Sequence, residues 1–341
     1  MNSTPSLTKK DFLYLSDWPT DELTSIIKLA TDLKKNNYRE HIAKDRVLGL
    51  FFNNPSLRTL ISFQTAAAHL GAQSVVIQPG KSSWNIELED GTIMDGDNQE
   101  HIKEMMQVLS NYVDTLGIRY FASFKDEEKD KNDTILKKMA GYASVPVINM
   151  ESATAHPCQA MADWMTLIET MGPSLDDVNV VLTWAPHPHP LPRAVPQTTL
   201  EAFVRSGANV TLACPPEMMP DKPVLNNIKQ YASSNLNITH KRDEALKNAD
   251  IVYAKSWHAA PVYSNPDEEK KIRQQHKDWT LTAKDMAKTR SARFMHCLPI
   301  RRNVVAEDAV LDDPKAIHIE QAENRLHIQK AILMKLWNLS L

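Results

Sequence analysis

The chain has 341 residues, with 39 Lys or Arg against 42 Asp or Glu, so its formal net charge is −3. This balance gives no basic field for nucleic acid, and no apolar run approaches the roughly 20 residues that span a bilayer. The length suits two domains, while an N-terminus without a signal-peptide pattern and three cysteines without metal-ligand spacing lead us to expect a cytoplasmic protein.

Helix and strand patterns alternate through the first part of the chain. Amphipathic or Ala-rich patterns predict helices at residues 21–35 (capped by Thr20), 61–70 and 97–112. Short apolar runs predict strands at residues 47–52, 74–77, 114–118 and 143–149. Such alternation predicts a parallel α/β sheet covered by helices on both faces.

A second series of the same kind follows. A helix is predicted at residues 160–171, strands at 178–184, 209–213, 251–253 and 294–296, and a final amphipathic helix at 323–341. The sequence therefore predicts a second α/β domain with its own parallel sheet.

Ser56-Leu57-Arg58-Thr59 stands between the strand and the helix predicted on either side of it. A small hydroxyl residue at such a turn can cap the helix and leave its first N–H groups aimed at an anion. Arg58 adds a fork that can grip two phosphate oxygens. The turn alone fits a phosphate site and an ordinary capped helix equally well.

Four more motifs favour the phosphate site: Leu116-Gly117-Ile118-Arg119, His156-Pro157-Cys158-Gln159, His296-Cys297-Leu298-Pro299 and Asn324-Arg325. In this order, and with Ser-x-Arg-Thr before them, they resemble the aspartate and ornithine transcarbamoylase family over nearly the full chain. The resemblance is strongest to the branch that acts on N-acylated ornithine. It implies a carbamoyl-phosphate domain at residues 1–150, an acylornithine domain at 151–321, and a last helix at 322–341 that packs back on the first domain.

The resemblance also assigns roles to the motif residues. Ser56, Leu57, Arg58 and Thr59 would hold the phosphate. Thr59, Arg119 and His156 would stabilise the charge that develops on the carbonyl oxygen, and Cys297 would act with them in catalysis. The remaining carbamoyl-phosphate contacts would come from Trp84, Pro157, Cys158, Gln159, Leu298 and Arg325. No cofactor and no metal is implied.

Trp84 lies in a loop, Gly80-Lys81-Ser82-Ser83-Trp84. In the resembling enzymes the corresponding tryptophan reaches the active site of a neighbouring subunit. The resemblance therefore implies a homotrimer with shared active sites, although the loop by itself fits a local surface tryptophan equally well.

Two features bear on the amine that would accept the carbamoyl group. The Asp-x-x-x-Ser-Met-Gly motif of enzymes for free ornithine is absent, and Lys255 of Tyr253-Ala254-Lys255-Ser256-Trp257 stands in its place. A cation there suits a substrate whose α-amine is acylated and whose α-carboxylate is free. Glu151 and Leu298 are the other positions expected to contact the N-acylornithine.

The acyl group is harder to assign. Gln99 stands where the acetyl enzymes have an acidic residue and the succinyl enzymes a proline. Val305 and the proline loop at residues 184–192 favour N-succinylornithine, whereas residues 78–81 and 322–330 favour N-acetylornithine. We expect N-acetylornithine as the acceptor, with N-succinylornithine as the alternative.

The proline loop contains His187 and His189, but no third ligand stands nearby in the sequence, so a metal site is not expected. In the acylornithine branch this loop encloses a shallow knot. Leu60 departs from the family, which has a second arginine there. A non-catalytic metabolite binder remains an alternative, supported by Leu60 and Gln99, while a kinase would need a glycine-rich phosphate loop that the chain lacks.

Overall fold

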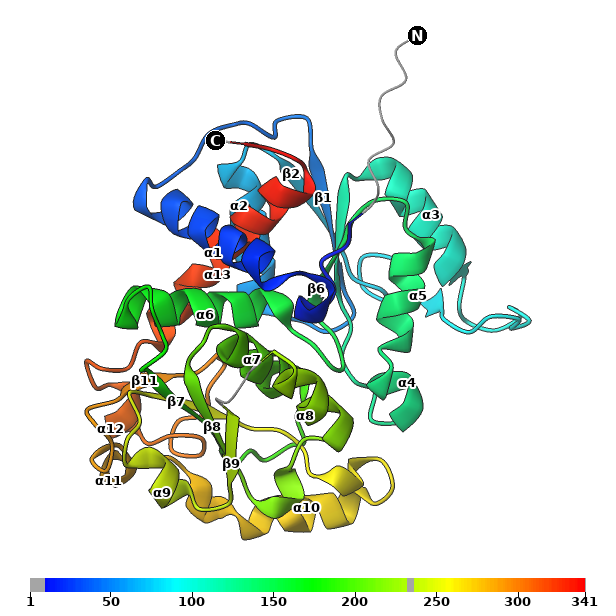
Figure 1. The fold of residues 1–341 in the computed structure, drawn as a ribbon. Coiled ribbons are helices and arrows are strands. Elements are labelled where there is room, and N and C mark those ends of the chain that lie inside the picture. The colour runs from blue at the N-terminus through cyan, green and yellow to red at the C-terminus, as the bar shows by residue number, and fades with distance from the viewer. Residues whose placement is uncertain (1–9, 232–235, 341) are drawn as a thin grey trace.

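Two parallel β-sheets organise the chain, which a computed structural model describes at residues 10–231 and 236–340 (Figure 1). The first sheet has the order β2-β1-β5-β6, formed by Gln73–Ile77, Val47–Phe52, Thr115–Arg119 and Val147–Glu151. The second has the order β11-β10-β7-β8-β9, formed by Arg293–Met295, Ile251–Lys255, Asn179–Trp184, Asn209–Ala213 and Leu236–Thr239. The two-domain α/β architecture predicted from the sequence is confirmed.

Helices cover both sheets. Those before the second sheet are α1 Thr20–Lys35, α2 Leu57–His69, α3 Ile102–Tyr112, α4 Glu127–Lys131, α5 Thr134–Tyr142 and α6 Pro157–Met171. Those that follow are α7 Ala194–Arg205, α8 Lys222–Lys229, α9 Arg242–Leu246, α10 Pro266–Gln275, α11 Ala283–Met286, α12 Asp308–Leu311 and α13 His318–Leu336.

The first sheet has a separate apolar core on each face. Leu48 and Leu50 of β1 pack with α1, α2 and α13, whereas Phe51 of the same strand packs with α3 and α5. Successive side chains of a strand point to opposite faces, so a strand buried on both sides reads as the continuous apolar run seen at residues 47–52.

Both sheets present a topological switch point to the same side. In the first sheet β1 lies between β2 and β5, and in the second β7 lies between β8 and β10. Ligands of open α/β sheets bind outside the carboxyl ends of the strands at such points. The turn after β1, Arg119 at the end of β5 and Lys255 at the end of β10 line one pocket.

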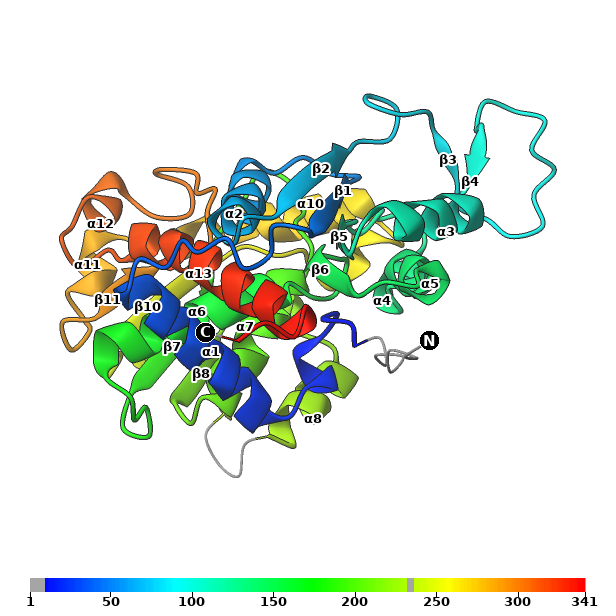
Figure 2. The same ribbon diagram turned by 90° about the horizontal axis from the view of Figure 1, so that it is seen from above.

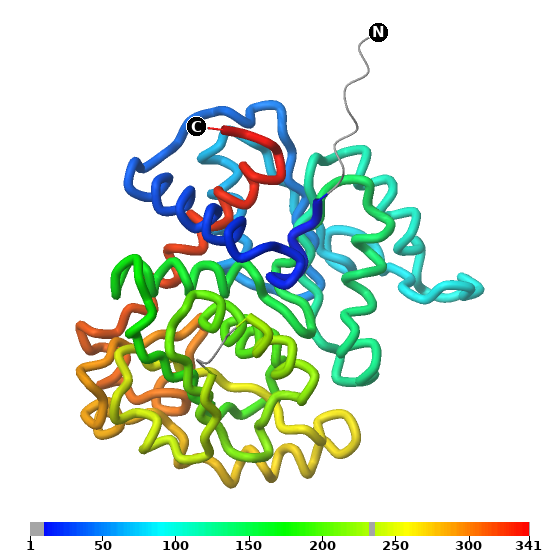
Figure 3. The backbone as a smooth tube through the Cα atoms, viewed as in Figure 1, coloured from blue at the N-terminus to red at the C-terminus, as the bar shows by residue number. Residues whose placement is uncertain are grey.

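The last helix returns to the first domain. Helix α13 packs against α1, α2 and α6, and Figures 1 and 3 show it beside α1 and α2 near the C-terminus. Its residues Ile328, Ile332 and Leu333 are buried. The helix begins at His318, earlier than the start predicted at residue 323.

A short arm projects from the first domain. Strands β3 (Ile86–Glu87) and β4 (Glu100–His101) pair in parallel, and the loop between them extends away from the body of the molecule (Figure 2). Trp84 and Gln99 lie at the base of this arm, where Gln99 N donates to Asn85 O over 3.3 Å.

Several helix boundaries predicted from the sequence were wrong. Pro19, not Thr20, is the N-cap of α1, because Thr20 is already helical and its hydroxyl accepts from Arg205. The helix predicted at 97–112 begins only at Ile102, because β4 precedes it. The last helix ends at Leu336 rather than Leu341, and Leu341 lies outside the described residues. None of the helices in the described residues is both long and apolar enough to cross a membrane.

Candidate active site

A pocket of about 430 Å³ lies between the two domains at the ends of β1, β5 and β10. Both domains supply its wall, so its shape depends on how they are held together. The wall consists of Pro55, Ser56, Leu57, Arg58, Thr59, Arg119, Phe121, Glu151, His156, Gln159, His187, Leu191, Pro192, Val195, Lys255, Cys297, Leu298, Pro299 and Arg325.

The turn after β1 forms one side of the pocket. Ser56 is the N-cap of α2, and its hydroxyl accepts from Thr59 N over 3.4 Å and donates to Thr59 Oγ1 over 3.1 Å. The cap orients the first turn of a helix of 13 residues, whose N-terminal end favours negative charge. Arg58 is half-buried at this end, so the turn has the form of an anion site.

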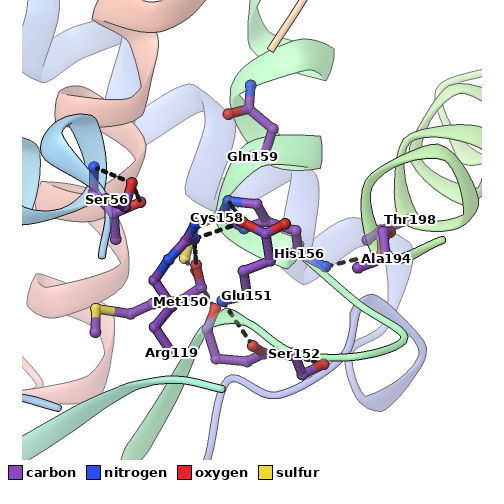
Figure 4. Close-up of polar contacts among 12 residues, drawn as sticks. Ser56, Arg119, Met150, Glu151, Ser152, His156, Cys158, Gln159, Ala194 and Thr198 are labelled. Atoms are coloured by element: carbon purple, nitrogen blue, oxygen red, sulfur yellow. Dashed lines mark hydrogen bonds and ion pairs between the residues drawn. The ribbon is translucent and has the colours of Figure 1, made fainter. Parts of the chain in front are cut away.

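Arg119 and Glu151 face each other across the ends of β5 and β6 (Figure 4). Arg119 Nη1 lies 2.5 Å from Glu151 Oε2, and His156 Nε2 lies 3.5 Å from the same oxygen. All three side chains are largely buried. The carboxylate therefore compensates the charge of the arginine at the point where the resemblance implies a carbonyl-binding group.

His156 is held neutral. Desolvation, reinforced by the nearby cations Arg325 and Arg119, keeps the pKa of its imidazole well below the ordinary value of 6.5. Its backbone N–H donates to Thr198 Oγ1 over 3.0 Å, which fixes the start of α6 against α7. A neutral imidazole surrounded by cations can donate a hydrogen bond without adding a further charge.

Arg325 joins the last helix to the turn after β1, residues 56–59. Its Nη2 donates to Thr59 Oγ1 over 3.0 Å, and its Nη1 donates to Gln159 Oε1 over 3.1 Å. Arg325 is 4% exposed, so these bonds hold a buried cation beside the turn.

The second domain contributes Lys255, Cys297 and Leu298. Lys255 is 8% exposed, and its ammonium donates to Ser256 O over 3.2 Å. No carboxylate within the described ranges pairs with it, so this cation is available to an anionic group of a ligand. Desolvation raises the pKa of the Cys297 thiol above its usual value, which keeps the thiol neutral.

Two pocket residues have unusual backbone conformations. Glu151 has a φ of 146° and Leu298 a φ of 53°. Side-chain-bearing residues adopt such angles at a cost, and they gather at functional sites where the surrounding structure holds them. Both lie where the sequence predicts contacts with the acceptor substrate.

Some predicted site residues do not line this pocket. Pro157 and Cys158 lie in the first turn of α6, where the buried Cys158 thiol donates to Asn149 O over 3.7 Å. Trp84 is 53% exposed and bonds Glu100 Oε2 through its indole N–H, and Gln99 is exposed on the same arm. Leu60, the departure from the family pattern, packs partly buried against the core of the first domain.

Other residues of the site were missed. The ring of Phe121 lies 4.3 Å below the Arg119 guanidinium and helps to hold it. Asp163 accepts from Gln159 Nε2 over 2.7 Å. Gln159 and Asp163 are four residues apart on a helix, and this spacing was the signal in the sequence that could have indicated their hydrogen bond.

His187 lines the pocket and contacts His189 and Arg301. Its Nδ1 contacts His189 O at 2.8 Å and its Nε2 accepts from Arg301 over 3.0 Å, so both ring nitrogens are engaged. Across residues 10–231 and 236–340, no three His, Cys, Asp or Glu side chains gather in a way that could hold a metal.

Comparison with known families and proteins agrees with this geometry. The family model for the carbamoyl-P binding domain of aspartate/ornithine carbamoyltransferases matches residues 10–169, and that for the Asp/Orn binding domain matches residues 193–336. The chain is 45% identical to N-acetylornithine carbamoyltransferase of Xanthomonas campestris pv. campestris, over 97% of this chain and 98% of that protein. It is 36% identical to N-succinylornithine carbamoyltransferase of Bacteroides thetaiotaomicron, over 92% and 94%.

Solved structures of transcarbamylases also resemble this chain. An acetylornithine transcarbamylase complexed with acetylcitrulline matches with a TM-score of 0.92 and 44% identity, covering 96% of this chain and 99% of that one. A mutant of N-acetyl-L-ornithine transcarbamylase with a glutamate replaced by proline, complexed with carbamyl phosphate and N-succinyl-L-norvaline, matches with the same TM-score and identity, and with the same coverage of both chains.

Proposed function

The chain belongs to the aspartate/ornithine carbamoyltransferase family, and we propose that it transfers the carbamoyl group of carbamoyl phosphate to the δ-amine of N-acetylornithine, a step of arginine biosynthesis. The observation that carries this proposal is the pocket itself. It combines an anion-binding turn, a buried Arg119 with a neutral His156, and a free Lys255 from the opposite domain.

The chemistry follows from where charge appears. The neutral amine attacks the carbonyl carbon, the bond from that carbon to the phosphate oxygen breaks, and the proton that the amine nitrogen loses passes to the departing phosphate. Arg58 and the start of α2 hold the departing phosphate. Thr59, Arg119 and His156 donate to the carbonyl oxygen as it gains charge. Gln159 holds the carbamoyl amide, while Arg325 and the Cys297–Leu298 segment complete the pocket.

The acceptor is held by the second domain. The Lys255 ammonium binds the α-carboxylate, and Glu151 and Leu298 contact the acylated part of the substrate. A free α-ammonium would meet Lys255 with like charge, so free ornithine is disfavoured. The greater identity to the acetyl enzyme supports N-acetylornithine, and N-succinylornithine is the second candidate because Gln99 carries no charge that would repel a carboxylate.

We propose further that the active site is shared between the chains of a homotrimer. The exposed Trp84 and Gln99 stand on a projecting arm and do not line the pocket of their own chain. Leu57, Ile61 and Val75, on α2 and β2, are 74%, 51% and 45% exposed, a surface that another chain would cover. In this arrangement both arm residues complete the pocket of a neighbour. A cytoplasmic location and a knot at the proline loop stay predictions.

The test is a panel of acceptors. The purified protein is incubated with carbamoyl phosphate and ornithine, N-acetylornithine or N-succinylornithine, and phosphate release above the spontaneous rate is measured. We expect release with N-acetylornithine, less with N-succinylornithine and none with ornithine. Binding of carbamoyl phosphate without release for any amine would favour a metabolite binder instead.

A further inference from the structure

The carboxylate of Asp163 is completely buried and lies outside the pocket wall. Its Oδ1 accepts from Gln159 Nε2 over 2.7 Å and from Gln321 Nε2 over 2.6 Å, and its Oδ2 accepts from Thr199 Oγ1 over 3.0 Å. No Lys or Arg in the described part of the chain forms an ion pair with it. A buried carboxylate without a cation costs free energy, so its retention here calls for a role that an apolar side chain could not fill.

One chain of hydrogen bonds runs from Asp163 to the phosphate turn. Because Gln159 gives its NH₂ to Asp163, its Oε1 is turned the other way, where it accepts from Arg325 Nη1 over 3.1 Å. Arg325 Nη2 in turn donates to Thr59 Oγ1 over 3.0 Å. Gln159 is labelled in Figure 4, on the helix that begins after His156.

A second chain runs from Asp163 to the opposite side of the pocket. Gln321 gives its NH₂ to Asp163, and its Oε1 accepts from the backbone N–H of His296 over 2.9 Å. His296 Nδ1 then accepts from Leu298 N over 2.8 Å. Desolvation keeps the pKa of His296 well below 6.5, so the ring is neutral and can accept at this nitrogen.

The two ends of a glutamine amide are almost equal in shape, and only the hydrogen-bonding partner decides which way the amide points. Above about pH 6 the Asp163 carboxylate is ionised, so it accepts, never donates, and selects the NH₂ end of both amides at once. Reversal of either amide would aim an NH₂ at Arg325 or at the His296 N–H, each of which is a donor.

We propose that Asp163 is a positioning residue: as a shared hydrogen-bond acceptor, it sets the orientation of Gln159 and Gln321 and thereby fixes both the Arg325–Thr59 side and the His296–Leu298 side of the pocket. This inference rests on the proposed function for what the pocket binds. Asp163 touches no reacting atom, and its effect on the reaction passes through the two amides.

Two substitutions of similar size test the role. Asp163→Asn keeps one oxygen for the two amides and places its NH₂ at the Thr199 hydroxyl, which can accept. Asp163→Leu removes the acceptor and leaves little room for a water to replace it. Calorimetric titration with carbamoyl phosphate measures the Kd and the binding stoichiometry of each folded variant, and steady-state kinetics give kcat and KM.

The expected result is a Kd for carbamoyl phosphate that rises about tenfold or more in Asp163→Leu, because two buried amide donors lose their acceptor, and that stays within about threefold of wild type in Asp163→Asn. A merely structural role would lower the binding stoichiometry and leave the Kd unchanged. That outcome, or an Asp163→Asn variant as impaired as Asp163→Leu, would overturn the proposal. Asp285→Asn is the matched control, because Asp285 is equally a buried carboxylate but bonds Thr282, Arg242 and Lys288, which lie outside the pocket.

If Asp163→Leu does not fold, Gln321→Met tests the second chain alone. It should lower kcat/KM for the N-acylornithine about tenfold and leave the Kd for carbamoyl phosphate within about threefold of wild type. Wild-type kinetics in the folded variant would refute the inference. A wild-type protein that binds carbamoyl phosphate but transfers nothing refutes the proposed function instead, and the Kd comparison at Asp163 still stands.

Discussion

Arg325 Nη2 donates to Thr59 Oγ1 over 3.0 Å, although the two residues are 266 positions apart. The bond connects the last helix to the first turn of α2. Segments far apart in the sequence therefore form adjacent parts of the pocket wall. Because the contact is buried, loss of the Thr59 hydroxyl would leave Arg325 Nη2 without this partner, whereas loss of Arg325 would leave Thr59 Oγ1 with its bond from Ser56 Oγ.

Arg58→Ala should weaken carbamoyl-phosphate binding by about a hundredfold without unfolding the protein. The change removes a charged partner of the phosphate, a loss worth about 2–5 kcal/mol when the contact is buried, while Arg58 makes no ion pair on which the described fold depends. Calorimetric titration measures the effect, with the exposed Arg290→Ala as the control. Tight binding by a folded Arg58→Ala variant would refute the phosphate-site assignment.

Trp84→Ala and Arg58→Ala should each be inactive alone and regain activity when mixed under conditions of subunit exchange. If each site takes Arg58 from one chain and Trp84 from its neighbour, about one site in four is intact in a random mixture of the two. Native mass spectrometry establishes the exchange and the number of chains per assembly. Exchange without recovery would mean that Trp84 does not act across an interface.

Gln99 should govern the choice of acyl group. Gln99→Glu places a negative charge near the acyl group and should suppress activity with N-succinylornithine by like-charge repulsion, while N-acetylornithine is unaffected or improved. Gln99→Pro should shift the ratio towards N-succinylornithine. The measurement is the ratio of kcat/KM for the two acceptors, and an unchanged ratio in both variants would exclude Gln99 from the acyl pocket.

The pH dependence of stability should reflect His156. Its pKa is lowered in the folded state, so below about 6.5 the unfolded chain binds a proton that the folded chain does not, and stability falls as the pH falls through this window. His156→Gln removes this contribution and should flatten the slope of the free energy of unfolding between pH 6.5 and 5 by up to about 1.4 kcal/mol per pH unit. Urea unfolding at several pH values measures it, and equal slopes would contradict a buried neutral imidazole.

Asp163 changes the pH dependence of the free energy of unfolding in the opposite direction to His156. Desolvation raises the pKa of its carboxyl from 3.8 to about 6 in the folded state, so the folded chain holds a proton that the unfolded chain has released, and stability falls as the pH rises through this window. Asp163→Asn should therefore make the gain of stability between about pH 4 and 6 steeper. A flatter slope in this variant would indicate a carboxyl that is stabilised in its ionised form.

The strands and the turn after β1 could be predicted because their signals are local. A continuous apolar run gave β1, and a β-branched segment with alternating polar residues gave β8, both with the bounds observed. A hydroxyl cap followed by an arginine indicated the anion site. The strand at residues 143–149 was placed too early, because Pro146 precedes the observed β6 and a proline cannot donate to the ladder. The short β9 was missed, since a pattern of only four residues, Leu236–Thr239, is too short to indicate a strand.

The contacts of the site were less accessible from sequence. The Arg119–Glu151 pair depends on the register of two neighbouring strands, and the network around Asp163 joins α6, α7 and α13. Neither can be deduced from spacing along one element. The resemblance to a family named many of the residues on the pocket wall, including Gln159, but not Phe121, and it did not indicate the buried acceptor Asp163.

Carbamoyl transfer to N-acetylornithine is tested most directly by following the carbamoyl carbon itself. Carbamoyl phosphate labelled with ¹³C is incubated with the protein and N-acetylornithine, and NMR spectroscopy records where the label goes while phosphate release is measured in parallel. We expect the label to enter the ureido group of N-acetylcitrulline with one phosphate released per product, and free ornithine to acquire none. Label that appears only in hydrolysis products, or that enters ornithine as readily as N-acetylornithine, would contradict the proposed transfer.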